Sequence, residues 1–582
     1  MCGIAGIVSK TKVTLGQLKL MSDVIAHRGP DGEGFWINAA ENIGFAHRRL
    51  SIIDLSDNGK QPMQYLDGRY IITFNGEIYN YVELKEELQK KGYTFKSHSD
   101  TEVILALYDL KKEECLADLD GMYAFAIWDE KEQKMFCARD RFGEKPFYYY
   151  KDEYRIIFAS EIKQFWSLGI EKKIISEKIS HFINKGEVID DVYPEKTFYE
   201  NIYSLKAAHY LICDKDIKLI VSNYWNLEGL KIDHSISFED ATEKFTKLFK
   251  HSISRRLRSD VPLGSSLSGG LDSSCIVYVI NSDFVRSGQQ QYTFSARFKN
   301  YEKDEGEYID ALLAQMPDVQ KADVFLGIDE FESDIDAITY YQDEPFQSSS
   351  VFAQYKVMQL ARRHNITVML DGQGADELLG GYETLYVDYL KQAFYNNPYL
   401  YKHDVKKYNE MHSSKYGTLD LYKNDTLSLM VKRKVKRILN RPQAVPETYF
   451  TDVLKRYIGG SQLQQLLRYA DRNAMAHSVE TRLPYLSHEL VEYVFSLPDH
   501  FKMRAGWPKY MLRSAFDKKI PDKIIWRKNK VGFETPEGSF LNTDNAISRI
   551  KKSGQYLMDM GIVVRPENIN PWMLYMINRY LG

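Results

Sequence analysis

The sequence predicts two successive domains, an α+β domain with layered antiparallel sheets and an α/β domain built on a parallel sheet. With 582 residues, the chain is longer than one hydrophobic core usually serves. Up to about residue 227, short apolar runs are punctuated by Gly, Asn and Asp, as is typical of strands joined by turns. Beyond residue 238, strand-like runs are each followed by helical periodicity, which favours parallel strands covered by helices.

The elements of the first part follow from its apolar runs. The runs at 3–8, 70–74, 121–128 and 155–158 predict strands. Apolar residues at helical spacing over 15–25 predict a helix that ends before Gly29-Pro30. A polar stretch at 228–239 then separates the two textures, so we predict domains at 1–227 and 238–582.

The composition excludes several classes of protein. Counting 77 Lys and Arg against 80 Asp and Glu gives a net charge of −3, which offers no general attraction for nucleic acid or anionic lipid. There is no run of eighteen apolar residues for a membrane span and no secretory signal pattern. The five cysteines form no close pairs, which favours a reducing cytoplasm over disulfides or structural zinc. We therefore expect a cytoplasmic protein that recognises its partners through local sites.

The amino terminus carries the first candidate for chemistry. A small side chain at position 2 commonly permits removal of Met1, which would leave Cys2 with a free α-amine. Such an amine has a pKa of roughly 7.7 to 8.0 and can accept the thiol proton, so that one residue supplies both nucleophile and base. The alternative is that Cys2 is only a small apolar residue at the start of a strand.

Three further segments of the first part each allow a structural and a functional interpretation. Arg49 stands beside a predicted strand, where its guanidinium would hold a carboxylate or simply face solvent. Asn75-Gly76 is a strong hairpin-turn signal, and the same turn would aim an amide and an N–H at an oxyanion. Ser99 to Glu102 matches a capping box, so Asp100 would either favour a helix start or receive an ammonium group.

Taken in order with the loop at 27–32, these segments resemble the glutaminase domain of class II glutamine amidotransferases, which has an N-terminal nucleophile (Ntn) fold. The runs at 120–129, 138–143 and 159–163 extend this resemblance across the first half. It implies that glutamine is a substrate, that Cys2 attacks its side-chain amide, and that ammonia is released. The resemblance further assigns oxyanion stabilisation to Asn75 and Gly76, and glutamine binding to Arg49, Asn75, Gly76, Glu77 and Asp100.

Two strand-to-helix turns carry the chemistry of the second part. Residues 267–274 join a predicted strand, 261–267, to a predicted helix through 275–280, and present small residues and N–H groups that suit phosphate. The lysine of a P-loop is missing there, and a tight connection is the alternative. Residues 370–377 follow a predicted strand at 366–370, and Asp376 with Asp272 would hold Mg²⁺ through oxygen ligands. The alternative for these acids is a favourable charge at a helix start.

The run Ser-Gly-Gly-Leu-Asp-Ser-Ser at 268–274 resembles the pyrophosphate loop of ligases that form acyl-adenylates from ATP. With the segments at 370–382, 471–485 and 526–533, it resembles the synthetase domain of glutamine-hydrolysing asparagine synthetases. The resemblance implies ATP and Mg²⁺, an internal ammonia tunnel, a homodimer, and Lys530 as a catalytic lysine beside the adenylate. It assigns ATP binding to Leu267, Ser268, Gly269, Gly270, Asp272, Ser273, Ser274, Phe294, Ser295, Asp371 and Gly372.

The second turn departs from that family. Members that make asparagine commonly have Ser-Gly-Glu-Gly-Ser-Asp-Glu, whereas this chain reads Asp-Gly-Gln-Gly-Ala-Asp-Glu at 371–377. The Gln373 amide cannot act as a base, so either another group takes the proton from attacking ammonia or the acceptor differs. We expect glutamine-fed, ATP-dependent amide formation with aspartate as the first candidate acceptor. Another carboxylate such as a sugar acid, a plain amidohydrolase and a nucleotide-responsive binding protein are the alternatives.

Overall fold

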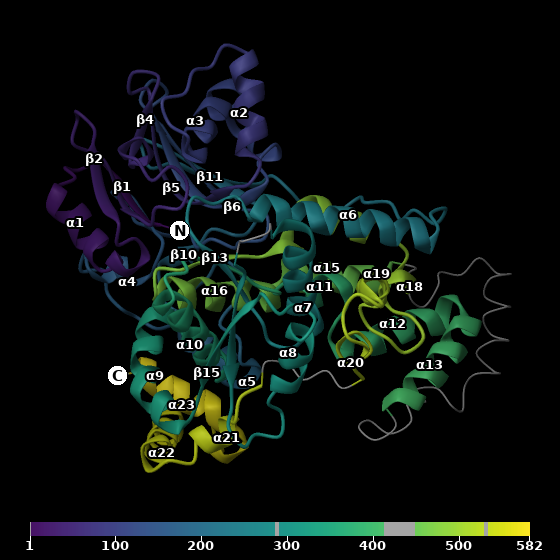
Figure 1. Ribbon diagram of the computed structural model, residues 1–582. Coiled ribbons are helices and arrows are strands. Elements are labelled where there is room, and N and C mark those ends of the chain that lie inside the picture. Colours follow the sequence, from purple (N-terminus) through teal and green to yellow (C-terminus); the bar gives the residue numbers. More distant parts are fainter. Residues whose placement is uncertain (1, 286–289, 413–447, 529–533, 582) are drawn as a thin grey trace, which may run out of the picture.

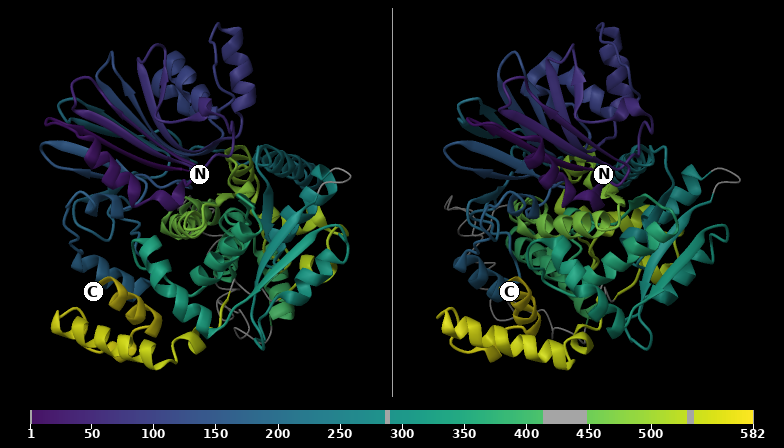
Figure 2. Two further views of the ribbon diagram at one scale, coloured as in Figure 1. Left: turned by 60° about the vertical axis from the view of Figure 1, so that its left-hand side comes forward. Right: turned by 90° about the vertical axis from the view of Figure 1, so that its left-hand side faces the viewer.

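The computed structural model describes residues 2–285, 290–412, 448–528 and 534–581. Figure 1 shows most of the first half of the chain, in purple and blue, above the second half in teal to yellow, whereas α5 (Ser176–Lys185) lies lower, among elements of the second half. The start of β1, Gly3–Ser9, lies where the two halves meet in all three ribbon views (Figures 1 and 2). Within the part of the chain that is described, no helix combines the length and the apolar character needed to cross a membrane.

The first half contains two six-stranded antiparallel sheets. The first sheet has the order β10 (Ile202–Ser204), β8 (Tyr148–Lys151), β9 (Arg155–Ala159), β1, β3 (Ile43–Arg49) and β2 (Gly32–Ile37). The second sheet has the order β12 (Leu219–Asn223), β11 (His209–Asp214), β7 (Lys134–Arg139), β6 (Gly121–Asp129), β5 (Tyr70–Ile78) and β4 (Met63–Tyr65). The predicted antiparallel layers are thus confirmed.

These sheets pack face to face, as the left view of Figure 2 shows. Ile4, Phe45 and Trp128, from β1, β3 and β6, are buried in one cluster between them. The outer face of the second sheet packs on α2 (Tyr81–Lys90) and α3 (Asp100–Lys111). The outer face of the first sheet packs on α1 (Leu15–Asp23) and α4 (Lys163–Trp166), and the same apolar cluster continues to α5, which packs on the C-terminal helix α23 (Pro571–Leu581). Because both faces of each sheet are covered, β6 is apolar from Met122 to Trp128 instead of alternating.

The second half is built on a five-stranded parallel sheet, as predicted. Its order is β15 (Gln320–Phe325), β14 (Tyr292–Arg297), β13 (Leu263–Ser266), β16 (Val368–Leu370) and β17 (Glu480–Arg482). The chain proceeds from β13 to β14 and β15 on one side and then to β16 and β17 on the other. The carboxyl ends of β13 and β16 therefore form a topological switch point, where α/β proteins usually bind ligands.

Helices cover both faces of this sheet. Met369 packs with α10 on one face, while its neighbour Leu370 belongs to the cluster that includes α7 on the other. The helices of this half are α6 (Phe238–Arg256), α7 (Leu271–Val279), α8 (Gly306–Leu313), α9 (Ile328–Gln342), α10 (Ser350–Arg363), α11 (Ala375–Leu379), α12 (Glu383–Asn396), α13 (Pro398–His412), α15 (Tyr449–Gly459), α16 (Ser461–Met475), α17 (His488–Phe495), α18 (Asp499–Lys502), α19 (Tyr510–Phe516), α20 (Asp522–Ile525), α21 (Glu537–Phe540), α22 (Asp544–Asp559) and α23 (Pro571–Leu581).

Two local predictions were wrong. Asn75 and Gly76 lie inside β5, where they pair with β6, and do not form a hairpin turn. A Cβ atom at Gly76 would lie 2.1 Å from the Met122 carbonyl oxygen, so glycine here permits close strand pairing. Ser99 caps α3 by accepting from the Thr101 N–H, but Glu102 accepts from the N–H groups of 96 and 97 instead of closing a capping box.

A buried group of six charged side chains joins the two halves, and we call it the interdomain cluster. Its members are Arg28, Glu161 and Lys163 from the first half and Asp343, Asp471 and Arg472 from the second. Arg28 donates to both oxygens of Asp471, at 2.9 and 3.0 Å, and to Glu161 at 2.9 Å. Three cations thus face three carboxylates, and this balance permits their burial.

Candidate functional sites

The first site lies where β1 of one antiparallel sheet and β5 of the other meet the second half of the chain. Cys2 precedes β1, and its backbone N–H donates to Asn75 Oδ1 in β5 at 2.9 Å. The Asn75 Nδ2 atom is buried and has no hydrogen-bond partner among the described residues. The amide is therefore oriented by Cys2 while its Nδ2 donors make no hydrogen bond to described residues, which suits a role toward an oxyanion.

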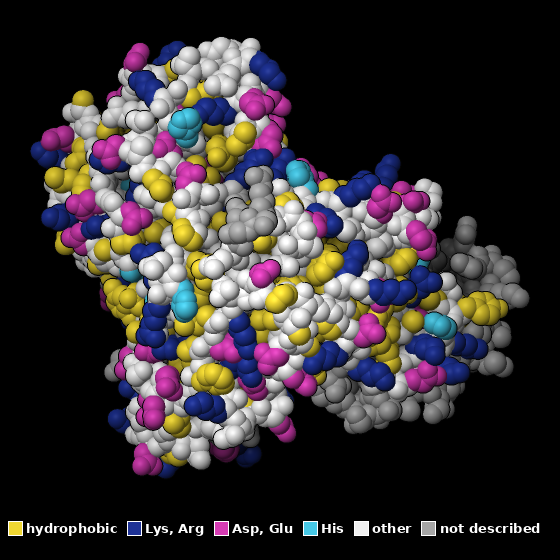
Figure 3. Space-filling view, viewed as in Figure 1, with side chains coloured by type: hydrophobic (Ala, Val, Ile, Leu, Met, Phe, Trp, Pro, Cys, Tyr) yellow, Lys and Arg dark blue, Asp and Glu magenta, His cyan; other side chains and the backbone are white. Residues whose placement is uncertain are grey.

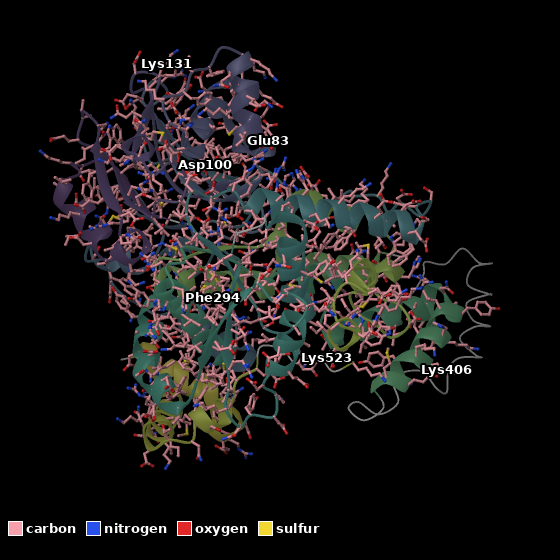
Figure 4. All side chains as sticks on the ribbon, in the orientation of Figure 1. Glu83, Asp100, Lys131, Phe294, Lys406 and Lys523 are labelled. Carbon is pink, nitrogen blue, oxygen red and sulfur yellow. The ribbon has the colours of Figure 1, made fainter. Side chains whose placement is uncertain are left out.

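Carboxylates give this pocket an affinity for a positive group. Asp100 and Glu77 both line it with Cys2, and Asp100 is labelled in the upper half of Figure 4. Asp100 Oδ2 accepts from the Ile78 N–H at 2.8 Å, and burial raises the Asp100 pKa to about 6. Burial, followed by repulsion from Asp100, also raises the Glu77 pKa well above its usual range. A substrate ammonium would relieve this repulsion, so the pair suits the α-amine of an amino acid.

Arg49 lines the same pocket at the end of β3. Its Nη1 atom donates to the Ser56 carbonyl at 2.9 Å, and its Nη2 atom donates to the Asp54 carbonyl. The guanidinium is thus held against the 54–59 loop. A carboxylate ligand would have to use the other N–H groups of Arg49 or displace these bonds.

Burial raises the pKa of the Cys2 thiol, although Arg49 partly opposes the shift. The thiol is therefore protonated at neutral pH and needs a base when it reacts. His47 is a poor candidate because burial lowers its pKa to about 3, and its Nε2 atom lies 3.1 Å from the Phe74 carbonyl oxygen. Removal of Met1 would give Cys2 its own α-amine, a base on the same residue as the thiol.

Sequence reasoning missed three residues at this site. Glu480 of β17 lines the pocket from the second half, and the Arg482 Nε atom donates to it at 2.6 Å. Attraction to positive groups that include Arg482 lowers the Glu480 pKa to about 2 despite burial, so its carboxylate stays charged. Arg28 donates from Nε to the Cys2 carbonyl at 3.0 Å. Glu480 and Arg482 lie some 400 residues from the motifs they complete, so no local pattern predicts them.

The second site is a cavity of about 380 Å³ at the carboxyl ends of β13 and β16. Ten of the residues predicted to bind ATP or metal line it together, namely Leu267, Ser268, Gly270, Asp272, Ser273, Phe294, Ser295, Asp371, Gly372 and Asp376. Gly269 and Ser274 do not line it, because Gly269 faces Glu305 and Tyr308 and Ser274 is buried in α7. Lys530 lies outside the described residues.

The 268–274 loop, which the sequence predicts to bind phosphate, is held by its own serines. Ser273 Oγ accepts from the Ser268 N–H at 3.2 Å, and Ser268 Oγ accepts from the Gly270 N–H at 3.3 Å. The Phe294 ring, labelled in the lower half of Figure 4, packs in the apolar core, and Ser295 Oγ donates to the Leu267 carbonyl at 2.6 Å. Any contact of 294–295 with a nucleotide base would therefore come mainly from the backbone.

Lys509 is the main residue that sequence reasoning missed in this cavity. Its Nζ atom lies 2.6 and 2.7 Å from the two oxygens of Asp272 and 2.6 Å from Asp376 Oδ1. Carboxylates from two turns thus converge on one positive charge. Mg²⁺ is usually held by one or two carboxylates together with substrate phosphates, so this donor set fits the ion. The described residues contain no group of three or more His, Cys, Asp or Glu that would hold a metal unaided.

The turn after β16 places two polar side chains on the cavity wall. The Asp371 N–H donates to the Arg482 carbonyl in β17 at 3.0 Å, and Asp371 Oδ1 accepts from the Gly372 N–H at 2.6 Å. Burial raises the Asp371 pKa above its usual range. The Gln373 Oε1 atom is buried and has no hydrogen-bond partner among the described residues.

Comparisons with domain models and with known proteins all indicate one protein family. A glutamine amidotransferase domain model matches residues 1–225, and an asparagine synthase model matches residues 244–553. The glutamine-hydrolysing asparagine synthetase 1 of Bacillus subtilis is 31% identical over 94% of this chain and 88% of its own length. Synthetase 2 of the same organism is 30% identical over 99% of this chain and 78% of its own length. A protein of Gibberella zeae named amidase chry2 is 28% identical over 90% of this chain and 87% of its own length.

The order of the two sites along the chain agrees with the order of the two matching domain models. The amino-terminal thiol of Cys2, paired with the Asn75 amide, is followed along the chain by two glycine-containing turns at the switch point of a parallel sheet. The chain therefore belongs to the family of glutamine-hydrolysing asparagine synthetases.

Proposed function

We propose that this protein is an ATP-dependent ligase that takes nitrogen from glutamine at Cys2 and transfers it to an activated carboxylate, with aspartate as the first candidate acceptor. In this proposal, residues 1–227 form the glutaminase and residues 238–582 form the synthetase. The products with aspartate are asparagine, glutamate, AMP and pyrophosphate. A homodimer is part of the same proposal.

The first half-reaction releases ammonia. The Cys2 thiol loses its proton to the α-amine and attacks the glutamine side-chain amide, while Asn75 Nδ2 and the Gly76 N–H stabilise the oxyanion. Asp100 and Glu77 hold the substrate ammonium, and Arg49 meets its carboxylate. Ammonia leaves, and water then hydrolyses the thioester to glutamate.

The second half-reaction activates the acceptor. The acceptor carboxylate attacks the α-phosphorus of ATP, and pyrophosphate leaves toward the 268–274 loop and the amino terminus of α7. Asp272 and Asp376 would hold Mg²⁺, which supplies charge neutralisation on the phosphates when bound. Lys509 lies between these carboxylates and provides a positive charge at the same place, and we propose Lys530 as a further cation beside the adenylate.

One observation supports transfer between the two sites above all others. The strand β17 reaches both of them, because Glu480 lines the Cys2 pocket and the Arg482 carbonyl accepts from the Asp371 N–H in the synthetase cavity. Glu480 pairs with Val368 of β16, and Asp371 follows Val368 by three residues. Glu480 and Asp371 are therefore separated by roughly 10 Å along the strand direction. We propose that ammonia released at Cys2 passes along β17 to the acyl-adenylate.

A different acceptor is the second candidate, and the 371–377 turn favours it. Gln373 and Asp371 both depart from the pattern of family members that make asparagine, and both line the cavity. A sugar acid or a biosynthetic intermediate would undergo the same chemistry.

The deciding experiment measures pyrophosphate release by the purified full chain with ATP, Mg²⁺ and glutamine. Aspartate is compared with no acceptor and with a panel of other carboxylic acids. We expect acceptor-dependent release together with one amide per pyrophosphate. Ammonia release from glutamine without nucleotide consumption for any acid would contradict the ligase and support an amidohydrolase.

A further inference from the structure

The amidation step needs a proton acceptor that the residues assigned so far do not provide. When the ammonia lone pair bonds to the acyl carbon, the nitrogen becomes positively charged and must lose a proton before AMP leaves. Gln373 occupies the cavity wall but cannot accept that proton.

Five carboxylates line the described part of the cavity, and ion pairs remove most of them from consideration. Asp272 and Asp376 are both paired with Lys509, and Glu305 is paired with Arg527. An ion-paired carboxylate has a lowered basicity and a fixed role in charge balance. Glu383, which begins α12, lies outside the two ligand-binding turns.

Asp371 differs from these groups in what holds it. Its Oδ1 atom accepts from the neighbouring Gly372 N–H, and no described Lys or Arg forms an ion pair with it. This hydrogen bond from a backbone N–H positions the carboxylate without neutralising it. Burial raises its pKa, which makes it a stronger base than an exposed aspartate.

The location of Asp371 also matches the arrival of ammonia. Its backbone is bonded to β17, the strand that forms one wall of the Cys2 pocket. Gly372 follows directly, and a Cβ atom there would lie 3.1 Å from both Asp272 Cβ and the Ser273 N atom. The backbone of residues 371–372 thus lies between β17 and the phosphate loop, and Asp371 lines the cavity there.

From this placement, and resting on the proposed function, we infer that Asp371 is the general base of the amidation step. The ammonia nitrogen bonds to the acyl carbon, the carbonyl electrons move onto oxygen, and one N–H proton passes to the Asp371 carboxylate. The tetrahedral intermediate then expels AMP by breaking the bond from carbon to the phosphate oxygen. The proton passes from Asp371 to AMP or solvent, which restores the base. The Gln373 Oε1 atom accepts a hydrogen bond from the ammonia and orients it.

The test separates formation of the adenylate from its amidation. Asp371→Asn is compared with the wild-type full chain, using ATP, Mg²⁺ and L-aspartate, or the active acid of the panel above if aspartate is inactive. Hydroxylamine traps the adenylate as a hydroxamate. This reaction depends little on a general base, because the hydroxylamine adduct loses its proton readily to water. Ammonium chloride gives the amide in a parallel reaction.

We expect Asp371→Asn to lower amide formation by roughly a hundredfold or more relative to hydroxamate formation, so that the ratio of the two products changes. In the double variant Asp371→Ser with Gln373→Glu, a carboxylate returns to the same turn two residues later, and amide formation recovers by at least about tenfold. Equal loss of both products would instead make Asp371 a nucleotide-binding residue and overturn the inference. Undiminished amide formation, or no recovery in a double variant with normal hydroxamate yield, would overturn it too. Failure of the wild-type chain to form hydroxamate with any acid would contradict the proposed function itself.

Discussion

At the scale of single residues, the first site is a set of groups whose charges depend on burial. The amide of Asn75 is oriented by a bond from Cys2, and Asp100 and Glu77 repel each other until a positive group arrives. The orientation of the amide and the repulsion between the carboxylates both arise from the folded pocket. Single substitutions can therefore test each of them.

Cys2→Ala is expected to reduce glutamine-dependent amide formation by at least about a thousandfold, because the nucleophile is lost. Synthesis from ammonium chloride should stay within about twofold of wild type, since the second site does not use the thiol. Amide and pyrophosphate are measured with each nitrogen source. Loss of both activities in a folded variant would show that the two sites are not separate.

The pH dependence of glutamine use is expected to report Asp100. Its pKa is raised to about 6, so the carboxylate is charged above that pH and becomes neutral as the pH falls through it. Because the charge attracts the substrate ammonium, kcat/KM for glutamine should fall about tenfold per pH unit below 6. Glutamate release is measured from pH 5 to 8. Asp100→Asn should have a low kcat/KM without this inflection, and an unchanged inflection would assign it to another group.

The sequence predicted these residues only where they belong to short continuous motifs. Cys2, Gly76 and Asp100 each stand in such a motif and line one pocket, and the neighbouring Asn75 accepts from the Cys2 N–H. Lys509 was not predictable, because its partner Asp272 lies 237 residues away and a single lysine on an unmarked segment has no local signature.

At the scale of elements, hydrophobic periodicity predicted both sheet types, whereas a local turn signal failed. The alternation of strands and helices after residue 238 corresponds to the parallel sheet. Asn75-Gly76 predicted a turn, but pairing of β5 with β6 along their whole length outweighs that local preference. The position of β17 beside β16 was not predictable either, because helices and a long stretch of chain separate the two strands.

β17 provides the prediction at this scale. Glu480→Gln removes the negative charge that balances Arg482. Arg482 should then pair more strongly with Glu77, so that Glu77 binds the substrate ammonium less tightly. We expect the KM for glutamine to rise roughly tenfold while ammonia-supported synthesis changes little, since a lost charged hydrogen bond costs about 1.5–3 kcal/mol. The control is Glu489→Gln, a half-exposed glutamate of the same half. An unchanged KM would place Glu480 outside glutamine binding.

At the scale of the whole molecule, the halves are joined by buried charge, whereas the surface carries mixed charge. Figure 3 shows positive and negative side chains interspersed over one face, in keeping with a net charge of −3. The interdomain cluster gathers charge of both signs in the interior, and Arg28 connects it to the Cys2 carbonyl.

Arg28→Met is expected to destabilise the full chain by about 3–5 kcal/mol, because it leaves Asp471 and Glu161 buried without their partner. The control is Arg48→Met, which removes pairs with the exposed Asp23 and Glu33 and should cost no more than about 1 kcal/mol. The midpoints of urea unfolding are compared, together with glutaminase activity. Equal midpoints for the two variants would contradict a stabilising role for the cluster.

The strand β17 also has a consequence for protein engineering. A glutaminase half taken from one relative and joined to the synthetase half of another would receive part of its glutamine pocket from a foreign strand. Such a chimera would need matched residues at 77, 480 and 482, even though the sequence boundary lies far from all three. The unit of recombination in this protein is therefore the glutaminase together with the 480–482 strand.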